Sequence, residues 1–268
     1  MKVLNKVVVV TGGANGIGRE LVLALLSKGA SVAAVDINAP ALEETLALAG
    51  RNRDRLATYI VNVADRAAVN ALPAQIIARF GAVDGIINNA GIIQPFVRLK
   101  DLDDAAIDRV MNVNLFGTLY MTRAFLPHLL ARPEAHITNI SSMGGFLPVP
   151  GQTIYGAAKA AVKLLTEGLS SELLGTNVKV TVVFPGAIGT NIAGNSGVMD
   201  SLPKDAGGPA PKMLAPGKAA QIILEGIEND AYRVLVGSDA RLMDAIYRLD
   251  PQRAARFIYN QMRTLLPK

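Results

Sequence analysis

Three side chains within residues 141–159 could together carry out proton transfer: a hydroxyl, a phenol and an amine. Tyr155 and Lys159 stand four residues apart in an Ala-rich segment, a spacing that on a helix puts both side chains on one face. A free phenol ionises near pH ~10, which is too high for a base at neutral pH. A cation about 4 Å from the phenolate stabilises it by roughly 4 kcal/mol at an effective dielectric of about 20. This energy corresponds to a lowering of the tyrosine pKa by up to about three units. We therefore expect Lys159 to lower the pKa of Tyr155 and make it a proton carrier near neutral pH.

Ser142 is the candidate for holding a substrate oxygen. It lies thirteen residues before Tyr155, at the carboxyl end of a buried strand that the apolar residues 137–140 predict. A hydroxyl at this place can hydrogen-bond the oxygen of a substrate while the proton moves. Tyr and Lys at helical spacing are also common on protein surfaces, so the pair alone is weak evidence for a catalytic site. The predicted elements around it must show whether it belongs to one.

A strand, a Gly-rich turn and a helix at the start of the chain predict a phosphate-binding site. Residues 6–10 are a β-branched run, and an amphipathic helix pattern follows the turn and ends at Gly29. Glycines let the backbone approach a pyrophosphate closely, and a helix N-terminus offers free N–H groups and the positive end of its dipole. The turn residues expected to bind a dinucleotide are Thr11, Gly12, Asn15, Gly16, Ile17 and Gly18.

Asp36 bears on the choice of cofactor, because it ends the second predicted strand, residues 31–35. A carboxylate there can accept hydrogen bonds from a ribose 2′-OH and would repel a 2′-phosphate. Neither Asn15 nor Ile37 supplies the basic group that a 2′-phosphate needs. The sequence therefore predicts NAD in preference to NADP, with a merely solvated Asp at a strand end as the alternative.

The alternation of strand and helix patterns predicts the fold class. Further strands are expected at residues 57–63, 84–87, 178–184 and 233–236. This alternation is typical of an α/β fold, a single-domain doubly wound parallel sheet with helices on both faces. Such sheets bind ligands at the carboxyl ends of their strands, where the polar residues 88–91 follow one strand.

Length and composition limit the possible functions. The chain has 268 residues, 50% of them hydrophobic, which suits one domain over residues 1–268. No apolar run approaches the roughly 18–20 residues needed to cross a membrane, and the start leads straight into a strand, so no signal peptide is expected. Without cysteine, and with only His128 and His136, disulfides, thiol catalysis and a His-rich metal site are excluded. We expect a cytoplasmic protein that binds no metal and no nucleic acid.

Three segments depart from the regular alternation. Asn114 lies inside a helical stretch over residues 103–131, where it could kink the helix, bind water or be a satisfied buried amide. Residues 189–216 are rich in Gly, Pro, Ser and Asn and are predicted to be a substrate lid, with surface disorder as the alternative. Residues 238–268 are predicted to be a C-terminal helical extension. Its excess of arginines indicates either a solvated tail or a docking face for an acidic carrier or a membrane surface.

Together these features resemble the short-chain dehydrogenases/reductases over nearly the whole chain, in the spacing of their compact core subclass. The resemblance implies a Rossmann fold and an NAD-dependent oxidoreductase. The matching residues stand in family order: Thr11-Gly-x-x-x-Gly-x-Gly18, Asp36, Asn88-Asn-Ala-Gly91, Asn114, Ser142, Tyr155-x-x-x-Lys159, and Pro185-Gly186 with Thr190.

The resemblance also implies a role for each residue. Tyr155 would be the catalytic acid/base, Lys159 would lower its pKa and bind the nicotinamide ribose, and Ser142 would hold the substrate oxygen. Asn114 would support a proton-relay water. Asn62 stands where the family commonly has Asp, and its carbonyl can still accept from the adenine amino group. The remaining residues expected at the cofactor are Val63, Asn89, Ala90, Gly91, Pro185 and Gly186, with Ile188 and Thr190 on the carboxamide side of the nicotinamide.

We therefore expect hydride transfer between NAD(H) and a secondary alcohol or ketone, hydrophobic or bulky because the predicted lid and residues 146–154 are largely apolar. One alternative is a β-ketoacyl thioester reductase using NAD(P)H, whose basic C-terminal region would meet an acidic carrier. Another is a non-catalytic dinucleotide-binding regulatory protein, which the complete Ser–Tyr–Lys set disfavours. Family resemblance favours a homotetramer or dimer through the long helices. The apolar residues of the last helix are expected to pack on the lid or on another subunit rather than on a membrane.

Overall fold

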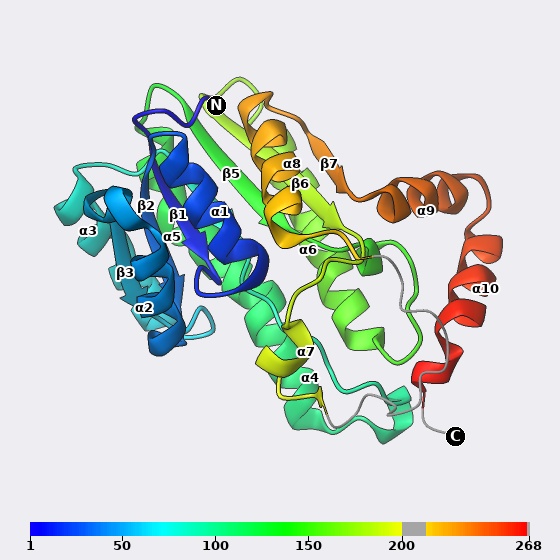
Figure 1. Cartoon of the computed structure of the whole chain (residues 1–268). Helices are drawn as coiled ribbons and strands as arrows, with labels where there is room; N and C mark the ends of the chain where they lie inside the picture. The colour runs from blue at the N-terminus through cyan, green and yellow to red at the C-terminus, as the bar shows by residue number, and fades with distance from the viewer. Residues whose placement is uncertain (200–212, 267–268) are drawn as a thin grey trace.

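The computed structural model describes residues 1–199 and 213–266, and a parallel sheet runs through its centre (Figure 1). Within those residues the sheet has seven strands in the order β3-β2-β1-β4-β5-β6-β7. The order reverses between β1 and β4, which is the point where doubly wound sheets bind ligands. The strands are β1 (Val7–Thr11), β2 (Ser31–Asp36), β3 (Leu56–Ile60), β4 (Gly85–Asn88), β5 (Ala135–Ile140), β6 (Val178–Pro185) and β7 (Arg233–Val236).

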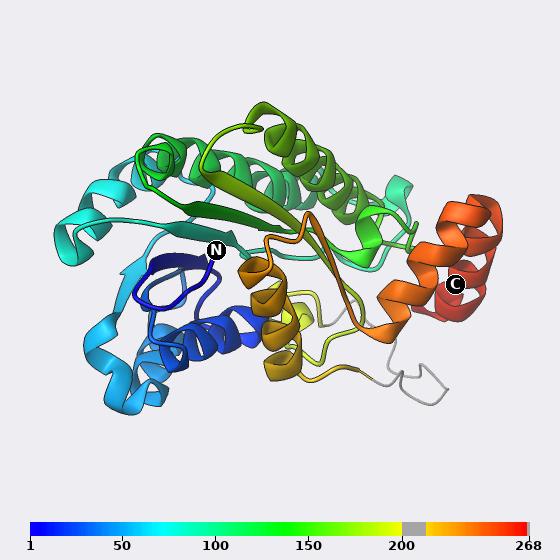
Figure 2. The ribbon, with the colours of Figure 1, turned by 90° about the horizontal axis from the view of Figure 1, so that it is seen from above.

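Helices cover both faces of the sheet, as the alternation of patterns predicts (Figure 2). The helices on one face are α1 (Gly16–Ser27), α2 (Ala39–Leu48) and α8 (Pro216–Glu228). The helices on the other face are α3 (Arg66–Phe80), α5 (Thr118–Leu130) and α6 (Thr153–Glu172). The α/β doubly wound fold expected from the sequence is therefore confirmed.

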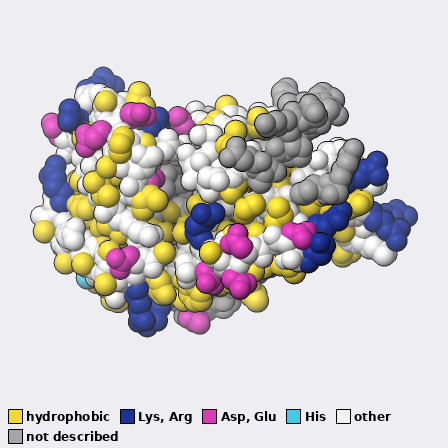
Figure 3. All heavy atoms as spheres, turned by 90° about the horizontal axis from the view of Figure 1, so that it is seen from below, with side chains coloured by type: hydrophobic (Ala, Val, Ile, Leu, Met, Phe, Trp, Pro, Cys, Tyr) yellow, Lys and Arg dark blue, Asp and Glu magenta, His cyan; other side chains and the backbone are white. Residues whose placement is uncertain are grey.

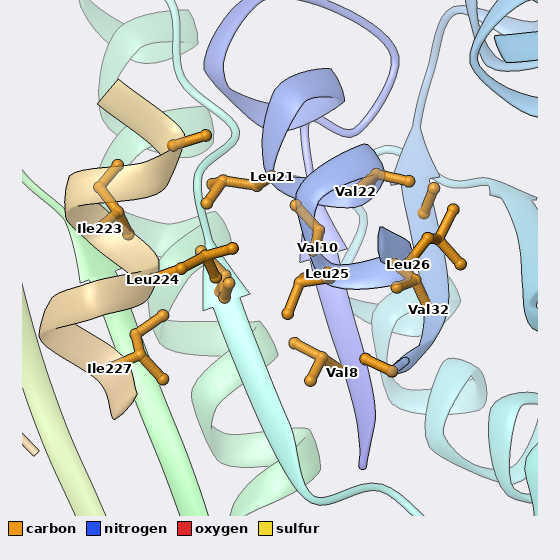
Figure 4. Close-up of a cluster of buried hydrophobic side chains, with 14 of the residues drawn as sticks. Val8, Val10, Leu21, Val22, Leu25, Leu26, Val32, Ile223, Leu224 and Ile227 are labelled. Atoms are coloured by element: carbon orange, nitrogen blue, oxygen red, sulfur yellow. The ribbon is translucent and has the colours of Figure 1, made fainter. Parts of the chain in front are cut away.

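Two hydrophobic cores, one on each face, hold the sheet rigid. All of β1 is buried, because a central parallel strand has helices on both of its faces. On the face shown in Figure 4, Leu21 and Leu25 of α1 pack with Ile223 of α8 over Val8 and Val10. Their helical spacing follows the 3.6-residue repeat, and each buried Val, Leu or Ile contributes about 1.5–3 kcal/mol. The rigid sheet fixes the ends of its strands, where the candidate site lies.

The third strand is shorter than predicted, because it ends at Ile60 and not at Val63. The side chain of Asn62 accepts a hydrogen bond from the backbone N–H of Ala64 at 3.0 Å, which turns the chain away from the sheet. Asp65 then caps α3 by accepting from the first N–H groups of the helix. Asn62 and Val63 therefore lie in a turn beyond the strand end.

The helix predicted over residues 103–131 has three parts. The first is α4 (Asp104–Met111), the last is α5, and a π-helical segment, Asn112–Gly117, joins them. The backbone carbonyl of Asn114 accepts a hydrogen bond from the Thr118 hydroxyl at 2.9 Å. The helical stretch is therefore irregular around Asn114, and π-helical turns are frequent at functional sites.

The C-terminal helices stand at the β7 end of the sheet (Figures 1 and 2). They are α9 (Ser238–Leu249) and α10 (Pro251–Met262), followed by a 3-10 turn, Arg263–Leu265. Met243 and Ile258 bury Leu147 of the chain segment after β5. Arg233 of β7 makes two hydrogen bonds to the Asp244 carboxylate, at 3.0 and 2.6 Å. These contacts attach the extension to the loop that follows Ser142.

Candidate active site

The Gly-rich turn after β1 closes tightly over the N-terminus of α1. Gly12 and Gly16 have φ angles of +66° and +53°, a region that favours glycine. A Cβ on Gly18 would lie 1.9 Å from the backbone oxygen of Gly12, so a side chain there would clash with the turn itself. The free N–H groups at the start of α1 therefore face a turn that only glycines can form, as expected for an anion site.

A cleft of about 270 Å³ opens between this turn and the ends of β2, β3 and β4. It brings together most of the residues that the sequence predicts to bind a dinucleotide. Those residues are Gly12, Asn15, Gly16, Ile17, Asp36, Asn62, Val63, Asn89, Ala90, Gly91 and Thr190. Ile37, considered above beside a 2′-phosphate, also lines the cleft, together with residues that were not predicted: Asn38, Val61, Ile92, Val113, Ile192 and Asn195. Asn38 could have been inferred from its place after Asp36, whereas no sequence signal marks Asn195.

Asp36 stands at the rim of the cleft with both carboxylate oxygens held by backbone N–H groups. One oxygen accepts from Ala14 at 3.1 Å and the other from Asn38 at 3.0 Å. The nearby Arg19 is occupied, since it pairs with Glu44 at 2.8 Å. Among the described lining residues there is no Lys or Arg. The charge that the cleft presents at this end is therefore negative.

Thr11 and Gly18 support the cleft without lining it. The Thr11 hydroxyl accepts from the backbone N–H groups of Asn89 and Ala90, both at 3.0 Å. The Asn89 side chain donates in return to the Thr11 carbonyl at 3.0 Å. These bonds join the loop after β4 to the Gly-rich turn and hold the two walls of the cleft together.

The loop after β6 is held by a residue that sequence analysis missed, Asp239 in the first turn of α9. Its carboxylate accepts from the backbone N–H of Ala187 at 2.6 Å. A Cβ on Gly186 would lie 2.3 Å from the same carboxylate, so a side chain there would displace Asp239 from this contact. Pro185 ends β6, and Ile188 forms a parallel bridge with Leu214. Of the residues predicted to bind the cofactor in this loop, Thr190 alone lines the cleft. Pro185, Gly186 and Ile188 position the loop that carries Thr190.

Tyr155 and Lys159 lie on α6 as predicted, but their geometry differs from the expectation. The Lys159 amine lies 6.0 Å from the centre of the Tyr155 ring and donates to the Ile140 carbonyl at 2.9 Å. Burial lowers the pKa of Lys159 to about 8. Burial also raises the pKa of Tyr155, and a hydrogen bond with Ser142 opposes that rise. The predicted lowering of the Tyr155 pKa by Lys159 is contradicted, because desolvation dominates and the amine points to a carbonyl.

Asn114 is fully buried, and both the oxygen and the nitrogen of its side-chain amide bond to one residue of the loop after β4. Its oxygen accepts from the Ile92 N–H at 2.9 Å, and its nitrogen donates to the Ile92 carbonyl at 2.8 Å. This is the satisfied buried amide that the sequence left open as an alternative. A role in a water relay stays a prediction.

The candidate site has two halves, the dinucleotide cleft and the region around Tyr155, and they meet at Gly91 and Ile192. Gly91 lines the cleft, and a Cβ on it would lie 3.1 Å from the Lys159 amine. Ile192 also lines the cleft and packs in a cluster with Tyr155. The remaining members of this apolar cluster are Ile93, Phe96, Val198, Ala193 and Leu265. The Tyr155 ring therefore lies between the cleft and an apolar wall. Figure 3 shows the corresponding face of the molecule, where hydrophobic side chains extend toward the end formed by α9 and α10 and basic side chains gather at that end.

Comparison with known proteins agrees with the fold. The family model for short chain dehydrogenases matches residues 6–200. SadH of Mycobacterium tuberculosis, which is named as an oxidoreductase, is 39% identical over 251 residues, covering 91% of this chain and 90% of SadH.

Two solved structures are also similar. A short-chain dehydrogenase/reductase from Burkholderia phymatum, in complex with NAD, is 26% identical with a TM-score of 0.81 and covers 93% of this chain and 96% of its own. A short-chain dehydrogenase from Burkholderia cenocepacia, in complex with NADP, is 28% identical with a TM-score of 0.79 and covers 96% and 99%.

The chain belongs to the short-chain dehydrogenase/reductase family. It is an oxidoreductase of the NAD(P)-dependent kind, and its structural relatives bind NAD in one case and NADP in the other. The cleft fits such a dinucleotide, since it joins a glycine turn at a helix N-terminus to a carboxylate at the end of β2. Over residues 1–199 and 213–266, no group of acidic and His side chains could hold a metal ion. In the same part of the chain, no helix has both the length and the apolar character needed to span a membrane.

Proposed function

We propose that this protein transfers a hydride between NAD(H) and a secondary alcohol or ketone with a bulky apolar group. The observation that carries the proposal is the position of Tyr155: Ser142 acts on the pKa of its phenol, and its ring packs in an apolar cluster with Ile192, which also lines the cleft. NAD supplies the hydride chemistry when bound, and the protein supplies position and proton transfer.

In this mechanism Ser142 holds the substrate oxygen and Tyr155 moves the proton. The Ser142 hydroxyl accepts from the Gly144 N–H at 3.0 Å, which fixes its orientation beside the phenol. Because burial raises the pKa of Tyr155, the phenol keeps its proton at neutral pH. A protonated phenol is a proton donor, so the arrangement favours reduction of a ketone near neutral pH and oxidation of an alcohol at higher pH.

NAD is the proposed cofactor because of the charge at the ribose end of the cleft. Asp36 presents a carboxylate there, and the described lining residues offer no cation to a 2′-phosphate. A 2′-phosphate close to Asp36 would be repelled, whereas a 2′-OH could donate to it. The NAD(P)H-dependent β-ketoacyl thioester reductase stays the alternative, and NADP preference would favour it.

The substrate class follows from the wall around Tyr155. The cluster that packs against the Tyr155 ring consists of hydrocarbon side chains, among them Ile93, Phe96, Val198 and Leu265. Apolar pockets with a few convergent polar groups bind ligands that carry one reactive oxygen on a hydrophobic body.

The test is absorbance at the reduced-nicotinamide band, with NAD and NADP in parallel against panels of cyclic, aryl and straight-chain ketones and alcohols. We expect turnover with NAD and a preference for bulky apolar compounds. Tyr155→Phe should lose turnover and keep NAD binding. Wild-type turnover by Tyr155→Phe would refute the catalytic assignment, and a preference for NADP would refute the Asp36 argument.

We also propose that the protein is a homo-oligomer, a dimer or tetramer, joined through the long helices. Phe116 is 38% exposed and Leu164 of α6 is 68% exposed, and a second subunit packed on the long helices would cover these apolar side chains. Light scattering after gel filtration tests this, and a monomer at micromolar concentration would refute it. The cytoplasmic location and the lid function of residues 189–216 stay predictions, since residues 200–212 lie outside the described part of the chain.

A further inference from the structure

The short loop after Gly91 is tied to three different parts of the molecule by three consecutive residues. Ile92 is held by Asn114, as described above. The backbone N–H of Ile93 donates to the hydroxyl of Ser196, which follows the short helix α7 (Ile192–Asn195), at 3.0 Å. Gln94 binds the N-terminus of α6, the helix that carries Tyr155. The third contact bears most directly on the chemistry.

Gln94 caps α6 from almost sixty residues earlier in the chain. Its side-chain oxygen accepts from the backbone N–H groups of Ile154 and Tyr155, at 2.8 and 3.0 Å. Both groups belong to the first turn of the helix, where N–H groups have no partner within the helix. The residue at the N-cap position, Gln152, makes no capping bond of its own and instead donates to the Gln94 backbone carbonyl at 2.8 Å. The two glutamines therefore join the loop to the helix end by three hydrogen bonds.

The burial of Gln94 indicates that its amide is specifically placed. The residue has no exposed surface. Its side-chain nitrogen finds no hydrogen-bond partner in the described part of the chain, and a buried unpaired N–H group costs free energy. The amide is retained in this position by its oxygen, which satisfies two N–H groups at once, one of them on Tyr155 itself.

We propose that Gln94 is a positioning residue for Tyr155: it holds the first turn of α6 so that the phenol stays buried against Ser142. The role of Tyr155 in proton transfer rests on the proposed function, whereas the position of its ring does not. Gln94 acts through the backbone of the helix and through the partial positive charge at the helix N-terminus, which its carbonyl dipole offsets.

Few charged or polar groups surround Tyr155, so the effect of a change at Gln94 on the Tyr155 pKa can be attributed to Gln94. Lys159 is the charged side chain that the structure places against the ring, at 6.0 Å from its centre, and Ser142 supplies the hydrogen bond. The neighbours from the loop after β4, from the α7 region and from the C-terminal turn are apolar, and they are Ile93, Phe96, Ile192, Ala193, Val198 and Leu265. A change at Gln94 should therefore register in the titration of Tyr155 with few competing groups.

Two substitutions should move this titration in opposite directions. Gln94→Met removes the acceptor at similar volume, which leaves two partly positive N–H groups uncompensated and loosens the burial of the phenol, so the Tyr155 pKa should fall by about one unit. Gln94→Glu keeps the acceptor and adds a negative charge that the two N–H groups stabilise, so the Tyr155 pKa should rise by about one unit. Gln152→Met is the matched control, because it removes a buried amide from the same junction and leaves both α6 N–H groups bonded to Gln94.

The measurement is an NMR titration of the full chain carrying carbon-labelled tyrosine, with the Tyr155 signal assigned from Tyr155→Phe. It needs no substrate. NAD binding, followed by calorimetry, checks that each variant is folded. We expect a lower pKa in Gln94→Met, a higher one in Gln94→Glu and an unchanged one in Gln152→Met.

A Tyr155 pKa that is the same in Gln94→Met and wild type, or that shifts in the same direction in both Gln94 variants, would overturn the proposal. If Gln94→Met does not fold, Gln94→Glu decides, since an unchanged pKa there also overturns it. Failure of the proposed function would appear separately, as wild-type turnover by Tyr155→Phe alongside the expected opposite shifts.

Discussion

The cofactor half and the substrate half of the candidate site are assembled in different ways. The cofactor half is built on one continuous stretch, Val7 to Asp36, which holds β1, the Gly-rich turn, α1 and β2, and the loops after β3, β4 and β6 complete its lining. The substrate half joins Gln94, Tyr155, Ile192 and Leu265, which come from four distant segments. A local motif fixes the first half, and tertiary contacts fix the second.

This difference predicts that single substitutions in the cofactor half abolish cofactor binding, whereas single substitutions in the substrate half reduce activity only partly. Glycine positions in a tight turn tolerate no side chain, because the backbone itself is the obstacle. Apolar walls and hydrogen-bonded loops can relax around a substitution, so their losses are smaller. Four substitutions, taken from the largest expected effect to the smallest, test this contrast.

Gly18→Ala should have the largest effect. Its Cβ would lie 1.9 Å from the Gly12 oxygen, so the turn must rearrange, at a cost of about 3 kcal/mol or more. We expect loss of measurable NAD binding by calorimetry and a lower midpoint of unfolding. Gly168→Ala in α6 is the control, since its Cβ meets nothing within 4 Å, and it should stabilise the protein by up to about 1 kcal/mol. Normal NAD binding by Gly18→Ala would contradict the geometry of the turn.

Lys159→Met tests how much the buried Lys159 amine, which lies between the cleft and Tyr155, lowers the free energy of unfolding. Because burial lowers the Lys159 pKa from about 10.4 in the unfolded chain to about 8, the unfolded state binds more protons between these two pH values. Wild-type stability should therefore rise with pH across that window, by roughly 3 kcal/mol relative to Lys159→Met. The raised pKa of Tyr155 acts in the opposite direction only above pH ~10, where the unfolded phenol ionises. Urea titrations at pH 7 and pH 9.5 should show about 2 kcal/mol of this difference, because pH 9.5 lies inside the window, and parallel pH profiles for the two proteins would refute it.

How far sequence could predict the site follows the same division. Gly12, Asp36 and Tyr155 with Lys159 were predictable because turn, strand end and helix each have a local signature, and the fold follows from the order of those elements. The pKa direction of Tyr155 was not, because spacing gives proximity along a helix and says nothing about burial or about which carbonyl the amine will bind.

Contacts between distant segments were equally beyond prediction from local patterns. Asp239 reaches Ala187 across 52 residues, and nothing near either position in the sequence marks the pair. Gln94 carries no local signature in the sequence, and its bond to Tyr155 depends on how two loops pack. Such residues are visible once the sheet has brought the ends of its strands together.

Asp239→Ala should weaken the cofactor half moderately by acting from the C-terminal extension. It removes a charge-assisted hydrogen bond to the Ala187 N–H, typically worth about 1.5–3 kcal/mol, from a loop that positions Thr190 at the cleft. We expect NAD affinity to fall about tenfold. Asp239→Asn keeps an acceptor oxygen and should lose much less. Equal NAD affinity in Asp239→Ala and wild type would show that the extension does not position the cleft.

Leu265→Ala should have the smallest effect and should separate the two halves most cleanly. Leu265 packs with Ile93, Phe96 and Val198 in the wall around Tyr155, and its truncation removes about 1–2 kcal/mol of apolar contact from a partly buried position. Because this wall would touch the substrate and not the dinucleotide, KM for a bulky ketone should rise about fivefold while NAD affinity and kcat stay the same. Leu174→Ala, at a residue that is 79% exposed, is the control and should change none of these values. A change in NAD affinity of the same size as the change in KM would mean that the C-terminal segment supports the whole site, and the division into a local half and an assembled half would then not hold.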